Sequence, residues 1–200
     1  MPRTAQLRRR TPTIRRSKTM IPTETLKHEH DVILLVLEAV EREACAIRQA
    51  GKANAERVGK MIDFIRNFAD KCHHAKEENL LFVRFEQRGI PREGGPIGVM
   101  LAEHEKGRAH VRVVAEALPK AAQGDRHAAQ AVADNLMDYV LLLRVHIDKE
   151  NNVLYPMGDR ALTEDDQRSL AEAFAKVEAE EMGEGVHEKY HQLAHELAES

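Results

Sequence analysis

Four long stretches of this 200-residue chain carry apolar side chains at helical spacing, and short joints containing glycine, proline or asparagine separate them. Side chains three and four residues apart lie on the same face of a helix, so each stretch predicts a helix with one apolar face. Four such helices can bury these faces together as an antiparallel up-down-up-down four-helix bundle. We therefore predict an all-α fold with additional short C-terminal helices. The four stretches cover residues 23–51, 54–88, 97–118 and 125–151.

The residues at the helix ends predict where each helix begins and stops. Thr23 or Thr25 is a suitable N-cap for the first helix. We expect Pro119 to end the third helix, because proline lacks the backbone N–H that continues a helix. Pro156 is expected to close the fourth helix for the same reason, together with Gly158, whose backbone readily leaves the helical conformation.

The chain is expected to divide into a basic, disordered arm over residues 1–22, the bundle over residues 23–158 and a helical appendage over residues 159–200. Residues 1–20 carry seven positive charges and no acid, and removing them from the formal net charge of −3 leaves −10 on the remainder. Such a start suits a transit peptide, a nucleic-acid arm, a disordered tail or a segment upstream of a start at Met20. The acidic remainder argues against nucleic acid as the main partner.

The composition predicts a chain that works in a reducing cytoplasm and not in a membrane. No apolar run approaches the roughly 18 residues that a membrane helix needs. Cys45 and Cys72 are the two cysteines, too few for a disulfide framework, and we expect both to be buried or half-buried thiols. Nothing in the sequence identifies a protein partner.

Two segments share one pattern of side chains: HHAKEENLLF at residues 73–82 and HIDKENNVLYP at residues 146–156. In each, a histidine is followed by a lysine and a glutamate three and four residues later. On a helix, His73 and Glu77 therefore lie one turn apart on the same face, and so do His146 and Glu150. The repetition predicts that the second and fourth helices supply equivalent groups to one site.

The first and third helices each add a Glu-His pair to an otherwise apolar face, and the histidines are His30 and His104. The bundle interior then holds four imidazoles and two carboxylates, whose burial without a cation would cost roughly several kcal/mol per group. Imidazole and carboxylate ligands suit iron, manganese or zinc, and two bridging carboxylates suit a pair of ions. A ferritin-like site instead places Glu before His at a spacing of three, which the spacing here argues against.

The order His, His-x-x-x-Glu, His, His-x-x-x-Glu resembles that of the hemerythrin-like (HHE cation-binding) family. The local sequences HHAKEENLLF, MLAEHEKGR and HIDKENNVLYP also resemble segments of that family. The resemblance covers residues 23–158. It implies two non-haem iron (Fe) ions, which an oxo or hydroxo group can bridge. It further implies that Glu77 and Glu150 bridge the ions and that the histidines are terminal ligands: His30, His73, His104 and His146.

One position departs from the oxygen-carrying members of that family, which have a further histidine one turn after the third-helix histidine. Here that position is Arg108. The departure implies that one iron loses a ligand and gains an open position, which argues against reversible oxygen carriage. His74 is a possible substitute ligand, because a branch of the family places an extra ligand there. The alternative is that His74 lies at the margin of the bundle.

Three classes of function fit these observations. The first, which we favour, is a protein that binds dioxygen, nitric oxide or iron at the di-iron site. The second is a di-iron enzyme acting on peroxide or dioxygen, and the third is an iron or oxygen sensor. The expected partner in each is a small gaseous or peroxide ligand.

Several other polar residues have ordinary roles as their simplest explanation. We expect Tyr139 and Tyr155 to pack in the core. Three further histidines lie four residues apart on one face near the C-terminus, without an evident carboxylate-bearing partner helix, which predicts a solvated or packing face more than a second metal site. They are His187, His191 and His195.

Overall fold

The computed structural model describes residues 21–179 and 185–199, and within these ranges every regular element is a helix. Four long helical rods form the molecule's body. The first is α1 (Pro22–Ala50), and the third is α4 (Pro96–Ala122). The second rod joins α2 (Ala55–Phe64), η1 (Ile65–His74), η2 (Glu77–Leu81) and α3 (Phe82–Gln87) without a break. The fourth joins α5 (Arg126–Lys149), η3 (Glu150–Leu154) and α6 (Tyr155–Ala161).

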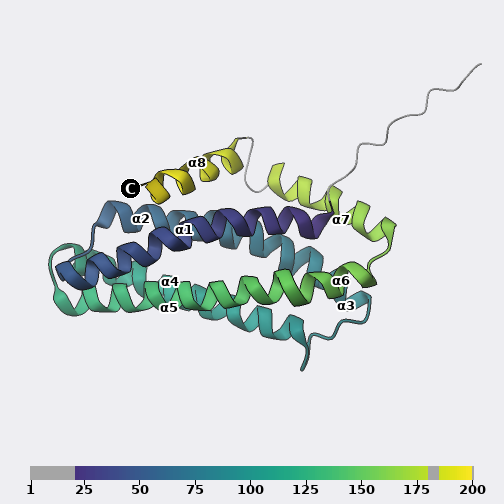
Figure 1. Ribbon diagram of the computed structural model, residues 1–200, viewed down its shortest axis with the longest axis horizontal. Helices are drawn as coiled ribbons and strands as arrows, with labels where there is room; N and C mark the ends of the chain where they lie inside the picture. Colours follow the sequence, from purple (N-terminus) through teal and green to yellow (C-terminus); the bar gives the residue numbers. More distant parts are fainter. Residues whose placement is uncertain (1–20, 180–184, 200) are drawn as a thin grey trace, which may run out of the picture.

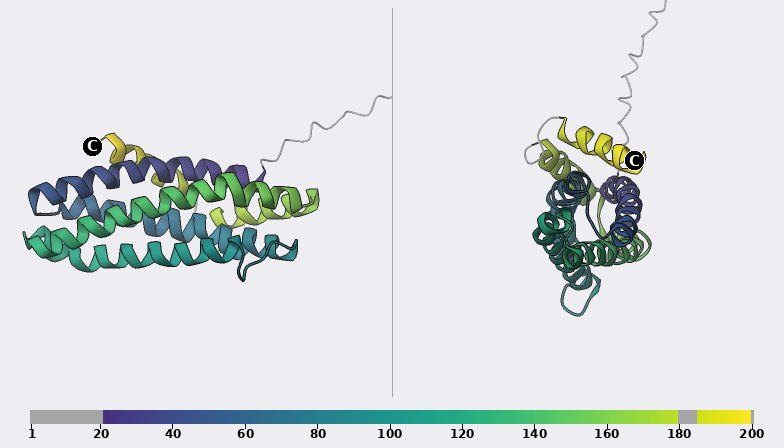
Figure 2. Two further views of the ribbon diagram at one scale, coloured as in Figure 1. Left: turned by 60° about the horizontal axis from the view of Figure 1, so that its bottom comes forward. Right: turned by 90° about the vertical axis from the view of Figure 1, so that its left-hand side faces the viewer.

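The four rods lie side by side and alternate in direction, as Figure 1 shows from the side and Figure 2 shows end-on. Short joints connect them, so neighbours in sequence are antiparallel neighbours in space. Gly51 makes the first of these turns possible, because it closes α1 with a positive φ of 66° that other residues rarely adopt. The predicted all-α bundle is confirmed.

Three helix ends differ from the sequence-based expectation. Helix α1 begins at Pro22, whose ring favours the first helical position, so Thr23 lies inside the helix and its hydroxyl donates to Asp159 at 2.9 Å. Helix α4 continues through Pro119 to Ala122, because the single N–H that proline lacks falls in the last turn.

The fourth rod also continues past Pro156, to Ala161. Pro156 occupies the first turn of α6, where its missing N–H is tolerated. Gly158 does not close the rod but allows a close approach: a Cβ there would lie 1.9 Å from the ring of Phe85. The helix therefore needs glycine at this position for packing.

Three segments of the second and fourth rods are π-helical, with hydrogen bonds to the fifth residue along the chain. His73 and His74 end η1, Glu77 begins η2 and Glu150 begins η3. Such wide turns are uncommon and occur often at functional sites. They place the repeated residues on the interior face of both rods.

The apolar core is divided into two clusters along the bundle axis. One contains Ile33, Phe68 and Leu143 among many others, and the second contains Leu26 and Leu81. Most of the buried polar residues of the rods, including the buried histidines, lie where the two clusters meet. A polar layer is therefore enclosed by apolar side chains on both sides.

Two further helices, α7 (Glu164–Val177) and α8 (Val186–Glu199), lie on the flank of the bundle (Figures 1 and 2). Thr163 caps α7 with a reciprocal capping box, and Asp166 also pairs with Arg84 and with Arg88, the latter at 2.7 Å. The sequence predicts that this helix runs to about Met182, a position outside the described residues. None of the described helices is long and apolar enough to cross a membrane.

Helix α8 covers α1 and the second rod with one apolar face. Tyr190 and Leu197 are buried, and the Tyr190 hydroxyl donates to Asp63 at 3.1 Å. Arg42 of α1 donates to the backbone oxygen of Ala198 at 2.7 Å. The appendage is thus packed against the bundle through α8 as well as α7.

Candidate metal centre

The seven residues singled out from the sequence come together in the polar layer of the bundle. Helix α1 supplies one of them, the second rod three, α4 one and the fourth rod two. All are buried, with at most 5% of their surface exposed. They are His30, His73, His74, Glu77, His104, His146 and Glu150.

One group of donor atoms comes from His30, His73, Glu77 and Glu150, and these atoms lie within 4.8 Å of one another. The Nε2 atom of His30 is 3.3 Å from Oε2 of Glu150, and Nε2 of His73 is 3.5 Å from Oε2 of Glu77. Two imidazoles and two carboxylates therefore face one point in the interior.

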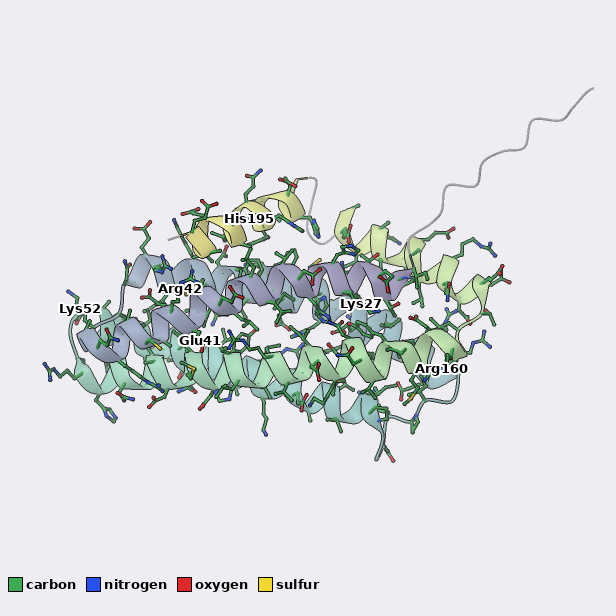
Figure 3. All side chains as sticks on the ribbon, viewed as in Figure 1. Lys27, Glu41, Arg42, Lys52, Arg160 and His195 are labelled. Carbon is green, nitrogen blue, oxygen red and sulfur yellow. The ribbon has the colours of Figure 1, made fainter. Side chains whose placement is uncertain are left out.

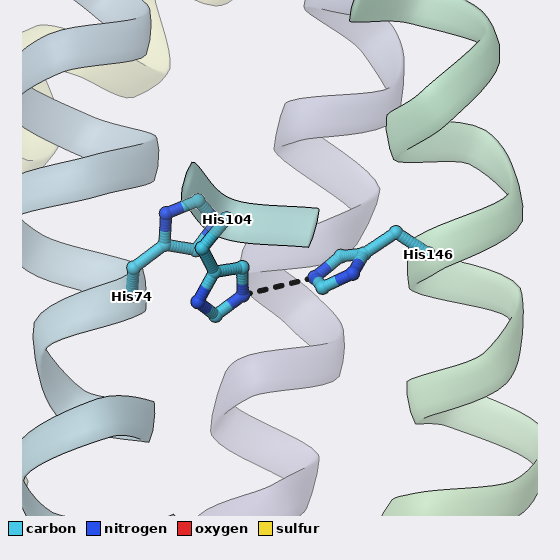
Figure 4. A group of neighbouring side chains, drawn as sticks. All are labelled: His74, His104 and His146. Carbon is cyan, nitrogen blue, oxygen red and sulfur yellow. Dashed lines mark hydrogen bonds between the residues drawn. The ribbon is translucent and has the colours of Figure 1, made fainter. Parts of the chain in front are cut away.

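A second group comes from His74, His104 and His146, whose donor atoms also lie within 4.8 Å of one another. Figure 4 shows the three imidazoles approaching from different helices, with Nε2 of His104 and Nε2 of His146 3.0 Å apart. The ring of His74 stacks on that of His104 with 3.8 Å between centroids.

The two glutamates lie between these groups. Oε2 of Glu77 is 3.5 Å from Nε2 of His73 in the first group and 3.5 Å from Nε2 of His104 in the second. Oε2 of Glu150 is 3.3 Å from Nε2 of His30 and 3.3 Å from Nε2 of His146. Each carboxylate therefore faces one histidine of each group, as a bridging ligand must.

Every one of the five histidines has its outer ring nitrogen, Nδ1, hydrogen-bonded to a side-chain oxygen. Carboxylate and amide oxygens accept, so Nδ1 donates in these pairs, and in a neutral ring Nε2 then keeps a lone pair toward the interior. This fixes both the tautomer and the orientation of each ring. The pairs are His73–Glu29 at 2.9 Å, His146–Glu103 at 2.9 Å, His104–Glu78 at 2.7 Å, His30–Asn151 at 2.8 Å and His74–Asp70 at 3.3 Å.

The side chains that accept from Nδ1 form an outer layer around the donor atoms, and the lysine of each repeated segment belongs to it. Lys76 donates to Glu29, and Lys149 donates to Glu103. The repeated His-x-x-Lys-Glu therefore contains an interior histidine, an outer lysine and an interior glutamate within five residues. The lysines and the Glu-His pairs are visible in the sequence, but their role in holding the interior histidines from outside is not.

Four interior atoms of the site lack hydrogen-bond partners among the described residues. They are Nε2 of His30, Oε2 of Glu77 and both carboxylate oxygens of Glu150. Leaving a buried polar group unpaired costs about 1–3 kcal/mol, and more if it is charged. A cation bound between the two groups would satisfy these atoms, so the donor set fits a metal ion.

Burial shifts the pKa of the site residues strongly. It raises the pKa of Glu150 to about 8 and, together with the nearby Glu150 charge, raises that of Glu77 well above its usual range. It lowers the pKa of His73 to about 3 and that of His146 to about 2, aided by neighbouring imidazoles. Without a cation, the interior therefore favours neutral forms of both residue types.

Tyr155 contributes to the site, although packing was the role expected for it. Its ring lies parallel to that of His30, with 5.6 Å between centroids, and its hydroxyl donates to Glu77. Its position just after the repeated pattern was the available signal, since Phe82 occupies the equivalent place in the first copy.

Arg108 points away from the interior donor atoms and into the outer layer. Its guanidinium donates to Asp70 at 2.8 Å and to Glu78 at 2.7 Å, the residues that hold His74 and His104. His74 lies in the second group and is 5% exposed, so its ring is buried with the other interior histidines. Its role as a substitute ligand stays a prediction.

Among the C-terminal histidines, His187 has carboxylate neighbours that were not evident from the sequence. Glu29, Glu178 and His187 place donor atoms within 4.8 Å of one another. A cation is already present there, because Lys76 donates to Glu29 and also to Glu178 at 2.9 Å. His191 packs against Phe68, and His195 lies exposed on α8, outside the bundle (Figure 3).

The two cysteines differ. Cys45 is exposed, contrary to expectation, and Cys72 is buried. Burial raises the pKa of the Cys72 thiol to about 11, which does not suit a nucleophile.

Comparison with known proteins agrees with this arrangement. The family model of the hemerythrin HHE cation-binding domain matches residues 21–158, which include all seven interior residues. The chain is 27% identical over 162 residues to Uncharacterized protein Rv1995 of Mycobacterium tuberculosis and to Uncharacterized protein Mb2018 of Mycobacterium bovis. Each match covers 80% of this chain and 62% of the relative, so the matched region is less than two thirds of those proteins. The chain belongs to the hemerythrin HHE cation-binding domain family.

Proposed function

We propose that the chain binds two non-haem iron ions in the polar layer and uses them to bind a small oxidant, dioxygen or nitric oxide, or to hold iron itself. One observation carries the proposal: two groups of donor atoms share Glu77 and Glu150 between them. His30 and His73 would hold one ion. The other would be held by His74, His104 and His146.

When bound, a pair of iron ions supplies the electrons that binding or reduction of a small oxidant requires. The chain's own residues prepare the site for them. The Nδ1 hydrogen bonds hold the rings in place and make each Nε2 a better donor. The Tyr155 hydroxyl holds a proton against Glu77, which orients that carboxylate.

The compartment is part of the same proposal. Both cysteines are free thiols, which suits a reducing cytoplasm.

Metal content tests the proposal. After anaerobic reconstitution, elemental analysis should find two iron ions per chain. Glu77→Ala and Glu150→Ala should each lose most of this iron, whereas Glu116→Ala, at an exposed position on α4, should not. Only trace iron in the reconstituted protein would contradict the proposal, and zinc at one per chain would indicate a mononuclear site.

An enzyme acting on peroxide or dioxygen is the second candidate. A cavity of about 230 Å³ reaches His74 and His104, so the second group is accessible to a molecule from outside. The optical spectrum of the iron-loaded protein should be recorded after oxygen, after gas removal and after peroxide. A spectrum that returns on gas removal favours a binding protein, while repeated peroxide consumption that His146→Ala abolishes favours an enzyme.

A further inference from the structure

The cavity beside the second histidine group is larger than a diatomic ligand needs. It lies between η1, α4 and α5, and its volume is about 230 Å³. A water molecule takes about 30 Å³ in the liquid, so the cavity has room for roughly seven groups of that size. A molecule of several carbon atoms fits this space.

Most of the cavity wall is apolar. Ile65, Val111 and Leu143 contribute aliphatic side chains, and Tyr139 contributes its ring. Gly107 lies between them without a side chain, and a Cβ there would be 3.3 Å from the ring of Tyr139. A larger residue at this position would therefore have to displace a wall residue or enter the cavity.

Two cations line the cavity without a partner. Arg66 and Arg112 are exposed, and neither forms an ion pair or hydrogen bond with any of the described residues. Arg108 differs from them, because Asp70, Glu78 and Glu105 already engage its guanidinium. Two unpaired guanidinium groups on a chain of net charge −3 favour an anion at this position.

Tyr139 adds a polar group to the same wall. The residue is 3% exposed, and its hydroxyl has no hydrogen-bond partner among the residues that the structure describes. The hydroxyl is not among the fully buried polar atoms that lack a partner, so it reaches open space at the cavity and can donate to a ligand oxygen there.

We propose that this cavity binds a small organic carboxylate. Its apolar body lies along Ile65, Val111 and Leu143, its carboxylate pairs with Arg66 and Arg112, and it lies next to His74 and His104. The inference deepens the proposed function, since it names the class of molecule presented to the second metal position. Binding itself depends on the cavity and the two arginines, so metal-free protein should also show it.

Titration with hexanoate tests the inference, by calorimetry and by amide and aromatic NMR shifts of both metal-free and iron-loaded protein. Hexanoate should bind at least about tenfold more tightly than 1-hexanol, acetate or inorganic phosphate, because only hexanoate uses both the wall and the guanidinium groups. Arg66→Gln and Arg112→Gln should each weaken binding about tenfold, while Arg126→Gln, at an exposed arginine of α5, should not. Val111→Phe, which fills the cavity, should abolish binding.

Equal binding of hexanoate and hexanol, or of hexanoate and phosphate, would overturn the inference. So would hexanoate binding that survives both arginine substitutions. If Val111→Phe does not fold, Gly107→Ala provides the steric test, and unchanged affinity in both arginine variants and Gly107→Ala would equally overturn it. Hexanoate binding by a protein that takes up no iron would remove the proposed function and leave this inference standing.

Discussion

Lys76 and Lys149 occupy equivalent positions in the two repeated segments but very different environments. The Lys76 side chain is fully buried and pairs with the buried Glu29, whereas Lys149 is 33% exposed and its partner Glu103 is 18% exposed. Removing one partner of a buried ion pair leaves a buried charge without compensation. The outer layer is therefore more important for stability on the Glu29 side.

Lys76→Met should lower the free energy of unfolding of the metal-free protein by roughly 3–5 kcal/mol, because it removes the cation that pairs with the buried Glu29 carboxylate. Lys149→Met should lower it by about 1 kcal/mol or less, as expected for an exposed pair. Urea denaturation of the two variants measures both values. Equal effects would mean that the two environments do not differ as the structure indicates.

Glu103 tests the outer layer as a support for metal binding. Its carboxylate accepts from Nδ1 of His146 at 2.9 Å and contacts no interior donor atom. Loss of such a partner usually weakens metal affinity about 10–100-fold, so Glu103→Ala should have this effect while the protein still folds. Competition with a coloured chelator gives the affinity, with Glu116→Ala as the control. An unchanged affinity would show that His146 does not need this support.

At the scale of elements, helix α8 covers the bundle without supplying an interior donor atom. Tyr190 and Leu197 are buried beneath it, and Nε2 of His187 lies 3.8 Å from Glu29. Deleting residues 186–200 should therefore leave the number of bound ions unchanged. It should lower the melting temperature by on the order of 10 °C, since burying two such side chains stabilises by about 3–6 kcal/mol.

Scanning calorimetry and elemental analysis of the shortened protein check this expectation. His195→Ala is the matched control, because that side chain is exposed on the same helix and should change neither quantity. Loss of bound metal on deletion would show instead that α8 is part of the metal centre.

Apolar periodicity was sufficient to predict the four rods, and three of the helix ends were wrong for a common reason. Thr23, Pro119 and Pro156 are strong local signals, but tertiary contacts and the position within a turn decide whether a helix stops there. The π-helical segments could not be predicted, because they depend on which backbone hydrogen bonds survive packing around Glu77 and Glu150.

The interior of the site could be predicted because its residues recur at fixed spacing in two places. The outer layer was partly visible: the Glu-His pairs and the repeated lysines stand in the sequence, but which carboxylate reaches which ring depends on the relative rotation of two helices. Tyr155 and the cavity depend on side-chain packing across three helices, for which periodicity gives no signal.

At the scale of the whole molecule, a bound cation belongs to the packed interior. We expect the metal-free protein to remain folded, because two apolar clusters enclose the polar layer. At a free ion concentration of about 1,000 times Kd, binding adds about 4 kcal/mol of stability, or roughly 10 °C in melting temperature. Calorimetry of chelated and iron-loaded protein checks this. Identical melting temperatures with loading confirmed would mean that the ligands are not buried.

The metal-free protein should be most stable at mildly acidic pH. The pKa of His73 is lowered to about 3 and that of His146 to about 2, so only the unfolded chain takes up these protons below about 6.5, and stability falls as the pH decreases. The pKa of Glu150 is raised to about 8, so the folded chain holds a proton that the unfolded chain has lost, and stability also falls as the pH rises toward 8.

Urea midpoints of chelated protein between pH 4 and pH 9 should therefore pass through a maximum. Glu150→Gln should weaken the decrease on the alkaline side, because it removes one of the two interior carboxyl groups that titrate there. A midpoint that rises steadily from pH 6 to pH 9 would exclude a protonated carboxyl group in the folded interior.

The set of interior donor atoms is nearly symmetrical, but access to it is not. Glu178 and His187 cover the Glu29 side, next to His73, while the cavity opens on the other side, next to His74 and His104. The consequence is kinetic. Ions at the two positions should exchange with the surroundings at different rates, so that isotope-labelled iron replaces the ion beside the cavity first. The ion beneath α8 is then the long-lived one, and its release requires the appendage to separate from the bundle.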